Sequence, residues 1–205
     1  MHNPARTSEF LLRRDQRQGE LKAILNDILA GHTEITLEIG CGHGHYLTAY
    51  AQAHPESFCL GIDLLKDRIA RASRKRDRAG LKNLVFLQAE ARECLAALPA
   101  DVRLAKIFIL FPDPWPKRRH HKNRILQPEF LTALAEKSAS DAHLFFRTDY
   151  APYHADAAET IEGHSDWKRD LTTPWPFELV TVFQSRAESY QSIVATRKLS
   201  LEKSG

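Results

Sequence analysis

The side chains best placed for chemistry lie in one segment, residues 111–124, with the sequence FPDPWPKRRHHKNR. Its single acid, Asp113, stands between two prolines, and Trp115 and a dense run of bases and imidazoles follow. Proline fixes φ and lacks an N–H, so this segment is neither an ordinary helix nor a central strand. The apolar run at 105–111 predicts a buried strand directly before it. A charged loop after a buried strand is where an open α/β sheet places its site.

A second candidate is the glycine-rich turn at residues 38–44, EIGCGHG, which follows a predicted strand. Gly40 and Gly42 allow a bulky ligand to approach the backbone closely. The third glycine comes one residue too early for the dinucleotide fingerprint. The acid at the end of the strand, Glu38, would repel a pyrophosphate. Glu38 instead suits a cationic ligand such as S-adenosylmethionine, which carries an ammonium and a sulfonium and has no phosphate.

Two further acids follow the next two predicted strands. Asp63 is placed to accept hydrogen bonds from ribose hydroxyls, and Glu90 is placed to approach an adenine. Together with Glu38 they predict a pocket for S-adenosylmethionine, although each acid alone is compatible with an exposed loop. An NAD enzyme stays open as an alternative. Walker-type ATP binding is unsupported, because the chain has no G-K-[ST] motif.

The elements that would position these side chains alternate along the chain. Strands are expected at residues 34–39, 58–62, 84–88, 105–111 and 142–147. Helices are expected at 20–30, 45–53, 65–79, 93–98, 128–138 and 152–162. This alternation predicts βαβ units and a parallel sheet. The two last strand-like segments, 179–183 and 192–196, leave no room for a helix between them, so we expect an antiparallel hairpin.

Length and composition favour one α/β domain. The chain has 205 residues, 43% of them hydrophobic, and we expect a basic, mobile arm at 1–17 before a single domain at 18–205. No apolar run approaches the roughly 18 residues of a membrane span, and no apolar segment follows the N-terminal bases as in a secretory signal. Three isolated cysteines show no zinc-ligand spacing. These features predict a cytoplasmic protein without a metal.

These motifs resemble the class I S-adenosylmethionine-dependent methyltransferases, and more narrowly the bacterial tRNA (guanine-N7)-methyltransferases. The narrower resemblance rests on residues 111–117, the bases at 119–124, Thr148-Asp149 with Tyr153, and residues 181–183 with Arg186. It covers residues 34–186. It implies a doubly wound, Rossmann-like sheet of seven strands with a C-terminal antiparallel hairpin and helices on both faces. It also implies methylation of a guanine N7 in tRNA, usually in the variable loop. We separately expect a monomer or a weak homodimer.

The resemblance also assigns roles to residues. It implies that Asp113 is catalytic and borders the cofactor. The implied cofactor residues are Glu38, Gly40, Gly42, Asp63 and Glu90. The implied substrate contacts are Lys117, Asp149, Thr181, Val182, Phe183 and Gln184.

The chemistry is compatible with these roles. Guanine N7 has an in-plane lone pair and no proton, so the enzyme must mainly align it with the methyl group. Asp113 can accept hydrogen bonds from guanine N–H groups and offset the positive charge that builds on the purine. Trp115 can stack on an extruded base.

Structural alternatives compete for several of these residues. Trp115 could pack over the edge of the sheet, Asp149 could cap a helix, and His121 could be a solvated loop residue. Four bases have helical spacing that places them on one face: Arg68, Arg71, Lys75 and Arg78. We expect a solvated helix face there, with a stripe of phosphate contacts as the alternative.

The chain departs from the family pattern mainly in the segments expected to contact the substrate. Asn123 stands where an arginine is usual, which removes a bidentate contact. Gln184 replaces a carboxylate, a usual glycine is missing from residues 187–190, and Glu90 stands where aspartate is commoner. Two alternatives therefore stay open: a methyltransferase for another RNA or a nucleotide, and a non-catalytic RNA-binding relative.

Overall fold

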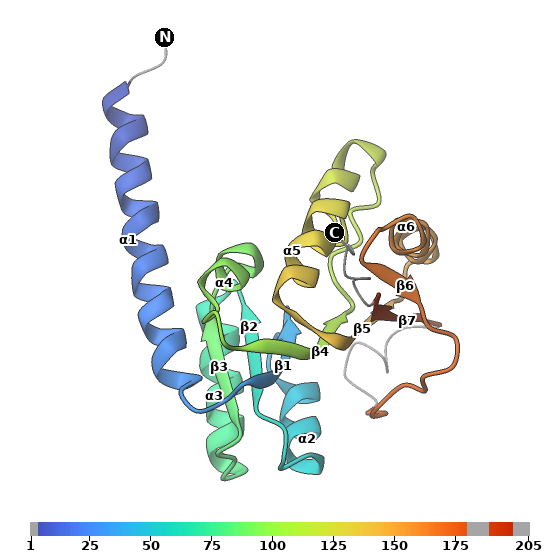
Figure 1. Ribbon diagram of the computed structural model, residues 1–205, viewed down its shortest axis with the longest axis horizontal. Coiled ribbons are helices and arrows are strands. Elements are labelled where there is room, and N and C mark those ends of the chain that lie inside the picture. The colour runs from blue at the N-terminus through green and yellow to red at the C-terminus, as the bar shows by residue number, and fades with distance from the viewer. Residues whose placement is uncertain (1–3, 180–188, 199–205) are drawn as a thin grey trace, which may run out of the picture.

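A single sheet lies between two layers of helices in the computed structural model (Figure 1). The structure describes residues 4–179 and 189–198, with the backbone alone for residues 4–14. The strands are β1 (Glu34–Ile39), β2 (Cys59–Asp63), β3 (Leu84–Gln88), β4 (Arg103–Leu110), β5 (Ser138–Thr148), β6 (Trp167–Arg169) and β7 (Gln191–Arg197). This arrangement confirms the predicted doubly wound, Rossmann-like α/β fold.

The order of the strands, β3-β2-β1-β4-β5-β7-β6, determines where a site can form. The chain winds outward from β1 through β2 and β3, then returns and winds the other way through β4 and β5. All these pairs are parallel. The winding reverses between β1 and β4, and open α/β sheets bind ligands in the crevice at the carboxyl ends of the strands at that point.

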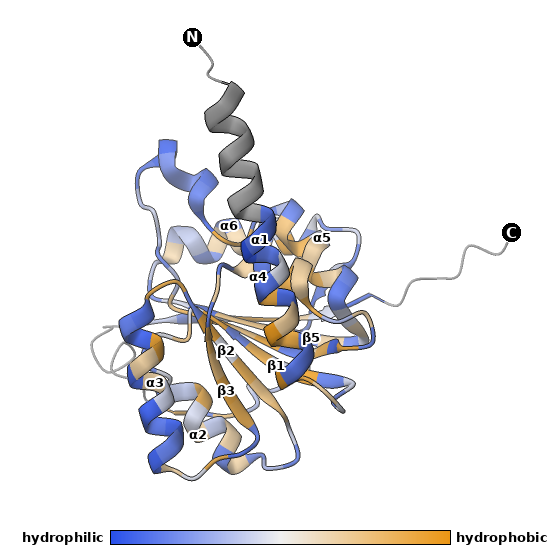
Figure 2. Ribbon diagram, turned by 90° about the vertical axis from the view of Figure 1, so that its left-hand side faces the viewer, coloured by the Kyte–Doolittle hydropathy of each residue, from blue (hydrophilic) through white to orange (hydrophobic). Residues whose placement is uncertain are grey.

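The helices divide between the two faces of the sheet, as Figure 2 shows. One face is covered by α1 (Pro4–Ile28), α4 (Ala91–Ala97), α5 (Pro128–Lys137) and α6 (Ala151–Glu162). The other face is covered by α2 (His45–Ala53) and α3 (Lys66–Arg78). Because helices cover both faces, the central strands are buried along most of their length. β1, for example, is buried at every position after its first residue.

The N-terminal helix is longer than the sequence indicated. A helix was expected at residues 20–30, but one continuous helix runs from Pro4 to Ile28. Near its end, Leu25 is fully buried against the sheet. The residues before Gln18 lack a regular apolar stripe, which is why their helical state was not foreseen. The mobility of residues 1–17 stays a prediction.

The antiparallel C-terminal strands of the sheet are confirmed, while the expected partner segment, 179–183, falls mostly outside the described residues. β7 pairs antiparallel with β5 on one side and with β6 on the other. Among the described residues, the edge strand is β6, at residues 167–169, which the sequence did not predict. Leu179 is not in a strand, and residues 180–183 lie outside the described part of the chain. β6 escaped prediction because it is three residues long and flanks one buried tryptophan, Trp167, with charged residues.

Within residues 4–179 and 189–198, no helix is long and apolar enough to cross a membrane. The same part of the chain contains no group of three or more His, Cys, Asp or Glu side chains arranged to hold a metal ion. Its cysteines, Cys41, Cys59 and Cys94, are buried and unbonded.

The packing of β2 against α2 and β3 depends on a glycine. A Cβ atom at Gly61 would lie 2.5 Å from the Phe86 ring and 3.0 Å from Leu47. Both side chains are buried and have little room to move. We expect Gly61→Ala to lower the free energy of unfolding by about 1–3 kcal/mol through overpacking, as measured by chemical denaturation.

The matched control is Gly163→Ala, at the C-terminal end of α6. There φ is −78° and the new Cβ would meet only the Glu159 carbonyl oxygen, at 3.4 Å. This variant should stay within about 1 kcal/mol of the wild type. Equal stability of the two variants would contradict the close packing at Gly61.

Candidate functional site

A cavity of about 580 Å³ opens at the carboxyl ends of β1, β2, β3 and β4. Its volume is typical of pockets for small ligands. Four of the residues predicted to hold a cofactor share its wall: Gly40, Asp63, Glu90 and Asp113. The topology thus brings together residues that are far apart in the sequence, at the place where the winding of the sheet reverses. Glu38 and Gly42 are not on this wall.

The glycine loop after β1 is fastened to the end of β2. The backbone N–H groups of Gly40 and Cys41 both donate to the Ile62 carbonyl oxygen, at 2.8 and 2.9 Å. The N–H of Gly42 donates to Asp63 Oδ2 at 3.0 Å. Gly40 has φ 75°, a left-handed conformation that favours glycine. Gly42 therefore holds the loop in place, while Gly40 lines the cavity.

Asp63 is buried, and much of its accepting capacity is used within the protein. Oδ1 accepts from the Leu65 N–H at 2.9 Å, and Oδ2 accepts from the Gly42 N–H and from Arg68 at 3.4 Å. A carboxylate offers about four acceptor sites, so about one remains. Asp63 could accept from both hydroxyls of a ribose only if Arg68 released Oδ2.

Glu90 has a structural role that the sequence analysis did not assign. It is the N-cap of α4, and its Oε2 accepts from the Glu93 N–H at 2.9 Å. A carboxylate at this position satisfies one of the unpaired donors of the first helical turn. Glu90 still lines the cavity, so the cap fixes its position on the wall.

Glu38 lies outside the cavity wall, buried on the α2 side of the sheet with 3% of its surface exposed. Its Oε2 is buried without a hydrogen-bond partner in the described part of the chain. Burial raises the pKa of Glu38 from 4.5 to about 8; a hydrogen bond from the Leu47 backbone opposes this shift, and the nearby Asp63 charge adds to it. A buried carboxyl with an unpaired oxygen can accept a donor or a positive charge from outside.

The loop that carries Asp113 is held in a strained conformation. Phe111 and Trp115, on either side of the acid, have φ values of 49° and 44°. This region is unfavourable for bulky side chains and costs about 1–3 kcal/mol for each residue. Asp113 is exposed on the cavity wall, and Trp115 lies on the same wall with its ring edge-on to His120, at 5.8 Å between centroids.

Arg124 clamps this loop to α6. Its guanidinium is buried, donates from Nε to the Pro114 carbonyl oxygen at 2.9 Å, and forms an ion pair with Asp156. It also lies over the Tyr153 ring, 4.8 Å from the centroid. Sequence reasoning grouped Arg124 with the other bases of residues 119–124. The structure instead makes it the residue that holds the backbone next to Asp113.

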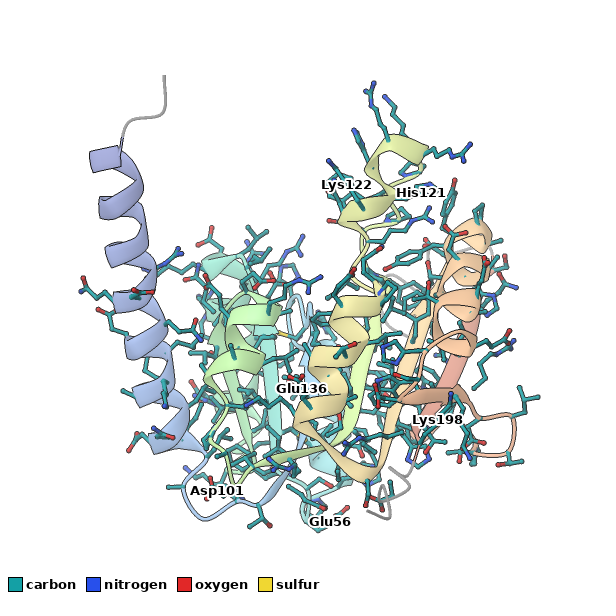
Figure 3. All side chains as sticks on the ribbon, turned by 45° about the horizontal axis from the view of Figure 1, so that its top comes forward. Glu56, Asp101, His121, Lys122, Glu136 and Lys198 are labelled. Carbon is teal, nitrogen blue, oxygen red and sulfur yellow. The ribbon has the colours of Figure 1, made fainter. Side chains whose placement is uncertain are left out.

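Two of the predicted substrate residues, Lys117 and Asp149, lie outside the cavity wall. Lys117 is exposed and precedes the 3₁₀-helix η1 (Arg118–Asn123). Figure 3 shows His121 and Lys122 on η1, which projects beyond the body of the domain. Asp149 is exposed and does not cap α6, whose N-cap is Tyr150, so the capping alternative is wrong. Thr181, Val182, Phe183 and Gln184 lie outside the described residues.

The two flanks of residues 180–188 meet at one arginine. Arg147, buried at the end of β5, forms a two-pronged ion pair with Glu178, at 3.1 and 3.0 Å. Its Nε donates to Ser192 Oγ at 2.9 Å. Its guanidinium also lies over the rings of Trp175 and Tyr190. Residues before and after the segment that contains the predicted substrate contacts are thus anchored to the sheet by one side chain.

Sequence reasoning missed an apolar part of the wall. Leu64 and Leu65, directly after Asp63, are exposed leucines that line the cavity. Two leucines in a loop that follows a strand-end acid are a usable signal, because exposed apolar pairs often mark a binding surface. Arg68 lies on the same wall. The cavity wall therefore combines an apolar surface, formed by the two leucines, with the carboxylates of Asp63 and Glu90.

The buried Glu38 carboxyl makes stability depend on pH. Its folded pKa of about 8 lies above the ordinary 4.5, so between these values the folded state keeps a proton that the unfolded state has lost. Stability from this group should therefore fall as pH rises from 4.5 to 8. We expect Glu38→Gln to gain stability relative to the wild type over that range, measured by denaturation at several pH values.

The control for this experiment is Glu136→Gln, an exposed glutamate on α5 (Figure 3). Its stability difference from the wild type should not change with pH. A Glu38→Gln difference that is equally flat would show that the buried carboxyl is ionised at neutral pH.

The clamp at Arg124 should keep η1 and the Asp113 loop ordered. Arg124→Lys keeps the charge but loses the planar fork that reaches both Pro114 and Asp156. We expect faster amide hydrogen exchange across residues 118–123 and a loss of about 1–3 kcal/mol in stability. Arg118→Lys, at an exposed position of η1, should change neither quantity. Unchanged exchange in Arg124→Lys would refute the clamp.

Comparisons with known proteins place the chain in a family. A family model described as "putative methyltransferase" matches residues 32–196. A tRNA (guanine-N(7)-)-methyltransferase of Microcystis aeruginosa is 36% identical over 143 residues, which are 68% of this chain and 67% of that protein. Proteins of the same name from Alkalilimnicola ehrlichii and Caulobacter vibrioides are 37% and 38% identical, over 63% and 62% of this chain. The chain spans only 55% and 56% of their lengths.

Solved structures agree on the fold. The aminoglycoside resistance methyltransferase NpmB1 matches with a TM-score of 0.58 and 17% identity, over 86% of this chain and 93% of that one. TrmN from Thermus thermophilus matches with a TM-score of 0.58 and 15% identity, over 87% of this chain and 48% of that one. Because the family model spans residues 32–196 and the Microcystis relative is 36% identical over two thirds of each chain, the chain belongs to the methyltransferase family that includes the tRNA (guanine-N(7)-)-methyltransferases.

Proposed function

We propose that this protein transfers a methyl group from S-adenosylmethionine to N7 of a guanine in tRNA, in the variable loop. The observation that carries the proposal is Asp113, an exposed carboxylate fixed between two strained aromatic residues on the wall of the cavity. Strain of this kind is maintained where a loop must present a side chain in one geometry. The resemblance of residues 111–117 to the family motif assigns the same residue.

The cavity and the adjoining glycine loop suit S-adenosylmethionine on two counts. The unpaired Oε2 of Glu38 beneath the glycine loop is an acceptor that an ammonium group at that loop would satisfy. Leu64 and Leu65 offer an apolar surface for an adenine ring, next to Asp63 and Glu90. When bound, the cofactor supplies an electrophilic methyl group on a sulfonium.

The contribution of the protein to the reaction is positioning. Guanine N7 carries its own lone pair, so no side chain has to remove a proton from it. Asp113 would accept hydrogen bonds from guanine N–H groups and offset the charge that develops on the purine. Trp115, on the same wall, offers a flat ring beside that position. The Arg124 clamp keeps both side chains at a fixed distance from the body of the domain, which alignment requires.

The bases of η1 suit an RNA partner. Residues 118–122 carry two arginines, two histidines and a lysine on a projecting 3₁₀-helix, most of them exposed. Exposed bases on an extension next to the cavity would contact phosphates and guide the RNA to Asp113. We propose Lys117 and Asp149 as further tRNA contacts, a cytoplasmic location, and a monomer or weak homodimer.

A second candidate is methylation of another RNA or of a nucleotide by the same cavity. It is favoured by Asn123, which lies on the cavity wall where the family usually has arginine. An amide there offers weaker phosphate recognition than a guanidinium. This change alters how the substrate is held, and it leaves Asp113 and the acids of the glycine-loop side in place.

The proposal is tested by incubating the protein with methyl-labelled S-adenosylmethionine and unmodified tRNA, then cleaving with aniline at N7-methylguanine. Label at a guanine N7 is the expected result. Label at another atom would favour the second candidate. Cofactor binding without transfer would indicate a non-catalytic relative and contradict the proposal.

Asp113→Asn should lower the transfer rate by at least about 100-fold, because the amide is neutral and no longer offsets developing charge. Stability should not change, because Asp113 is exposed. The control is Asp101→Asn, an exposed aspartate away from the cavity (Figure 3), which should transfer at the wild-type rate. Near-normal transfer by Asp113→Asn would remove it from the mechanism.

A further inference from the structure

A second hollow of about 600 Å³ lies beside the glycine loop, on the α3 side, and the proposed mechanism does not use it. Its lining is almost wholly basic. Four cations come from α3: Arg71, Arg74, Lys75 and Arg78. One imidazole, His43, comes from the loop and a second, His45, begins α2, and Asp77 is the only acid among the described lining residues.

One face of α3 extends from the cavity that contains Asp113 to this hollow. The sequence placed four bases on one face of this helix, and their side chains line both the cavity and the hollow. Arg68 lines the Asp113 cavity, whereas Arg71, Lys75 and Arg78 line the second hollow. With a rise of 1.5 Å per residue, this face runs about 15 Å along α3. Figure 2 shows α3 as hydrophilic along most of its length. A row of cations thus leads away from the candidate site.

The cations in this hollow are not neutralised by neighbouring acids. Asp77 pairs with Arg76 at 2.6 Å, and within the described part of the chain none of the four α3 cations of the hollow forms an ion pair. The Lys75 ammonium donates to the His43 carbonyl oxygen at 2.9 Å, which ties α3 to the glycine loop. Burial and the Arg78 charge lower the pKa of Lys75, and burial followed by Lys75 and His43 lowers that of His45. The local field is therefore positive.

We infer that this hollow and the α3 face bind the phosphate backbone of the tRNA beyond the target guanine. The inference rests on the proposed function and extends it to a second contact region, separate from η1. Four cations spread over about two helical turns exceed what one small anion requires, but they suit successive phosphates of a nucleic acid strand. The described lining residues include no apolar side chain that could insert into a membrane, so an anionic lipid surface is a poorer fit.

The test is the triple variant Arg71→Gln/Arg74→Gln/Arg78→Gln. All three side chains are exposed, so folding should not suffer. Lys75 is left unchanged because it supports the glycine loop. We expect the Kd and KM for tRNA to rise roughly 10-fold or more, and the slope of log K against log salt to fall by about two to three. The transfer rate at saturating tRNA and the affinity for S-adenosylmethionine should stay within about twofold of wild type.

The matched control removes three charges elsewhere: Lys22→Gln/Lys137→Gln/Lys168→Gln, on α1, α5 and β6. Its tRNA affinity and salt slope should resemble the wild type. Equal effects of the two triple variants would overturn the inference, because the loss would then reflect net charge alone. A wild-type Kd and salt slope in the α3 variant would also overturn it.

The results that would refute the proposed methyl transfer differ from those that would refute the phosphate contact. If the wild-type protein transferred no methyl group to tRNA, the proposed activity would fail before any variant was compared. If the wild-type protein methylated tRNA and the α3 variant did so with unchanged KM, only the phosphate contact would be refuted.

Discussion

The end of β2 holds the glycine loop, and the rest of the site depends on that attachment. One carbonyl oxygen, that of Ile62, accepts two N–H groups of the loop, and the Asp63 carboxylate accepts a third. The parallel pairing of β1 with β2 sets the register that makes these bonds possible. Asp63 therefore acts both as a fastener of the loop and as part of the cavity wall. A change at this residue would alter the backbone of the site as well as its charge.

Charges of opposite sign are segregated around the cavity. Acids lie at the ends of β1, β2 and β3, where Glu38 is buried and Asp63 and Glu90 face the cavity. Bases lie further out, on η1 and along α3. This arrangement suits a small cationic ligand held inside and a polyanion held outside. A protein with modest net charge can thus attract both, because the fields act locally.

The sequence predicted the elements that depend on local pattern, and the structure added the contacts that depend on distance in space. β1 and β3 lie where their apolar runs placed them, because each run is bounded by polar or glycine residues. The strand-end acids were found because parallel strands bring their carboxyl ends to one edge. The role of Arg124 could not be foreseen, since Asp156 is 32 residues away and nothing local distinguishes a buried guanidinium from a solvated one. β6 was too short to leave a periodic pattern.

Arg147 has a consequence for how this chain can change over evolution. The guanidinium grips Glu178 on one side of residues 180–188 and Ser192 on the other, and it is itself fixed at the end of β5. The residues that make these contacts, Arg147, Glu178 and Ser192, thus all lie outside residues 180–188. A substitution within the bracketed stretch, such as Gln184, leaves these contacts of Arg147 intact. Residues 180–188 can therefore accept mutations that change substrate recognition, while the contacts of Arg147 at the end of β5 keep the sheet unchanged.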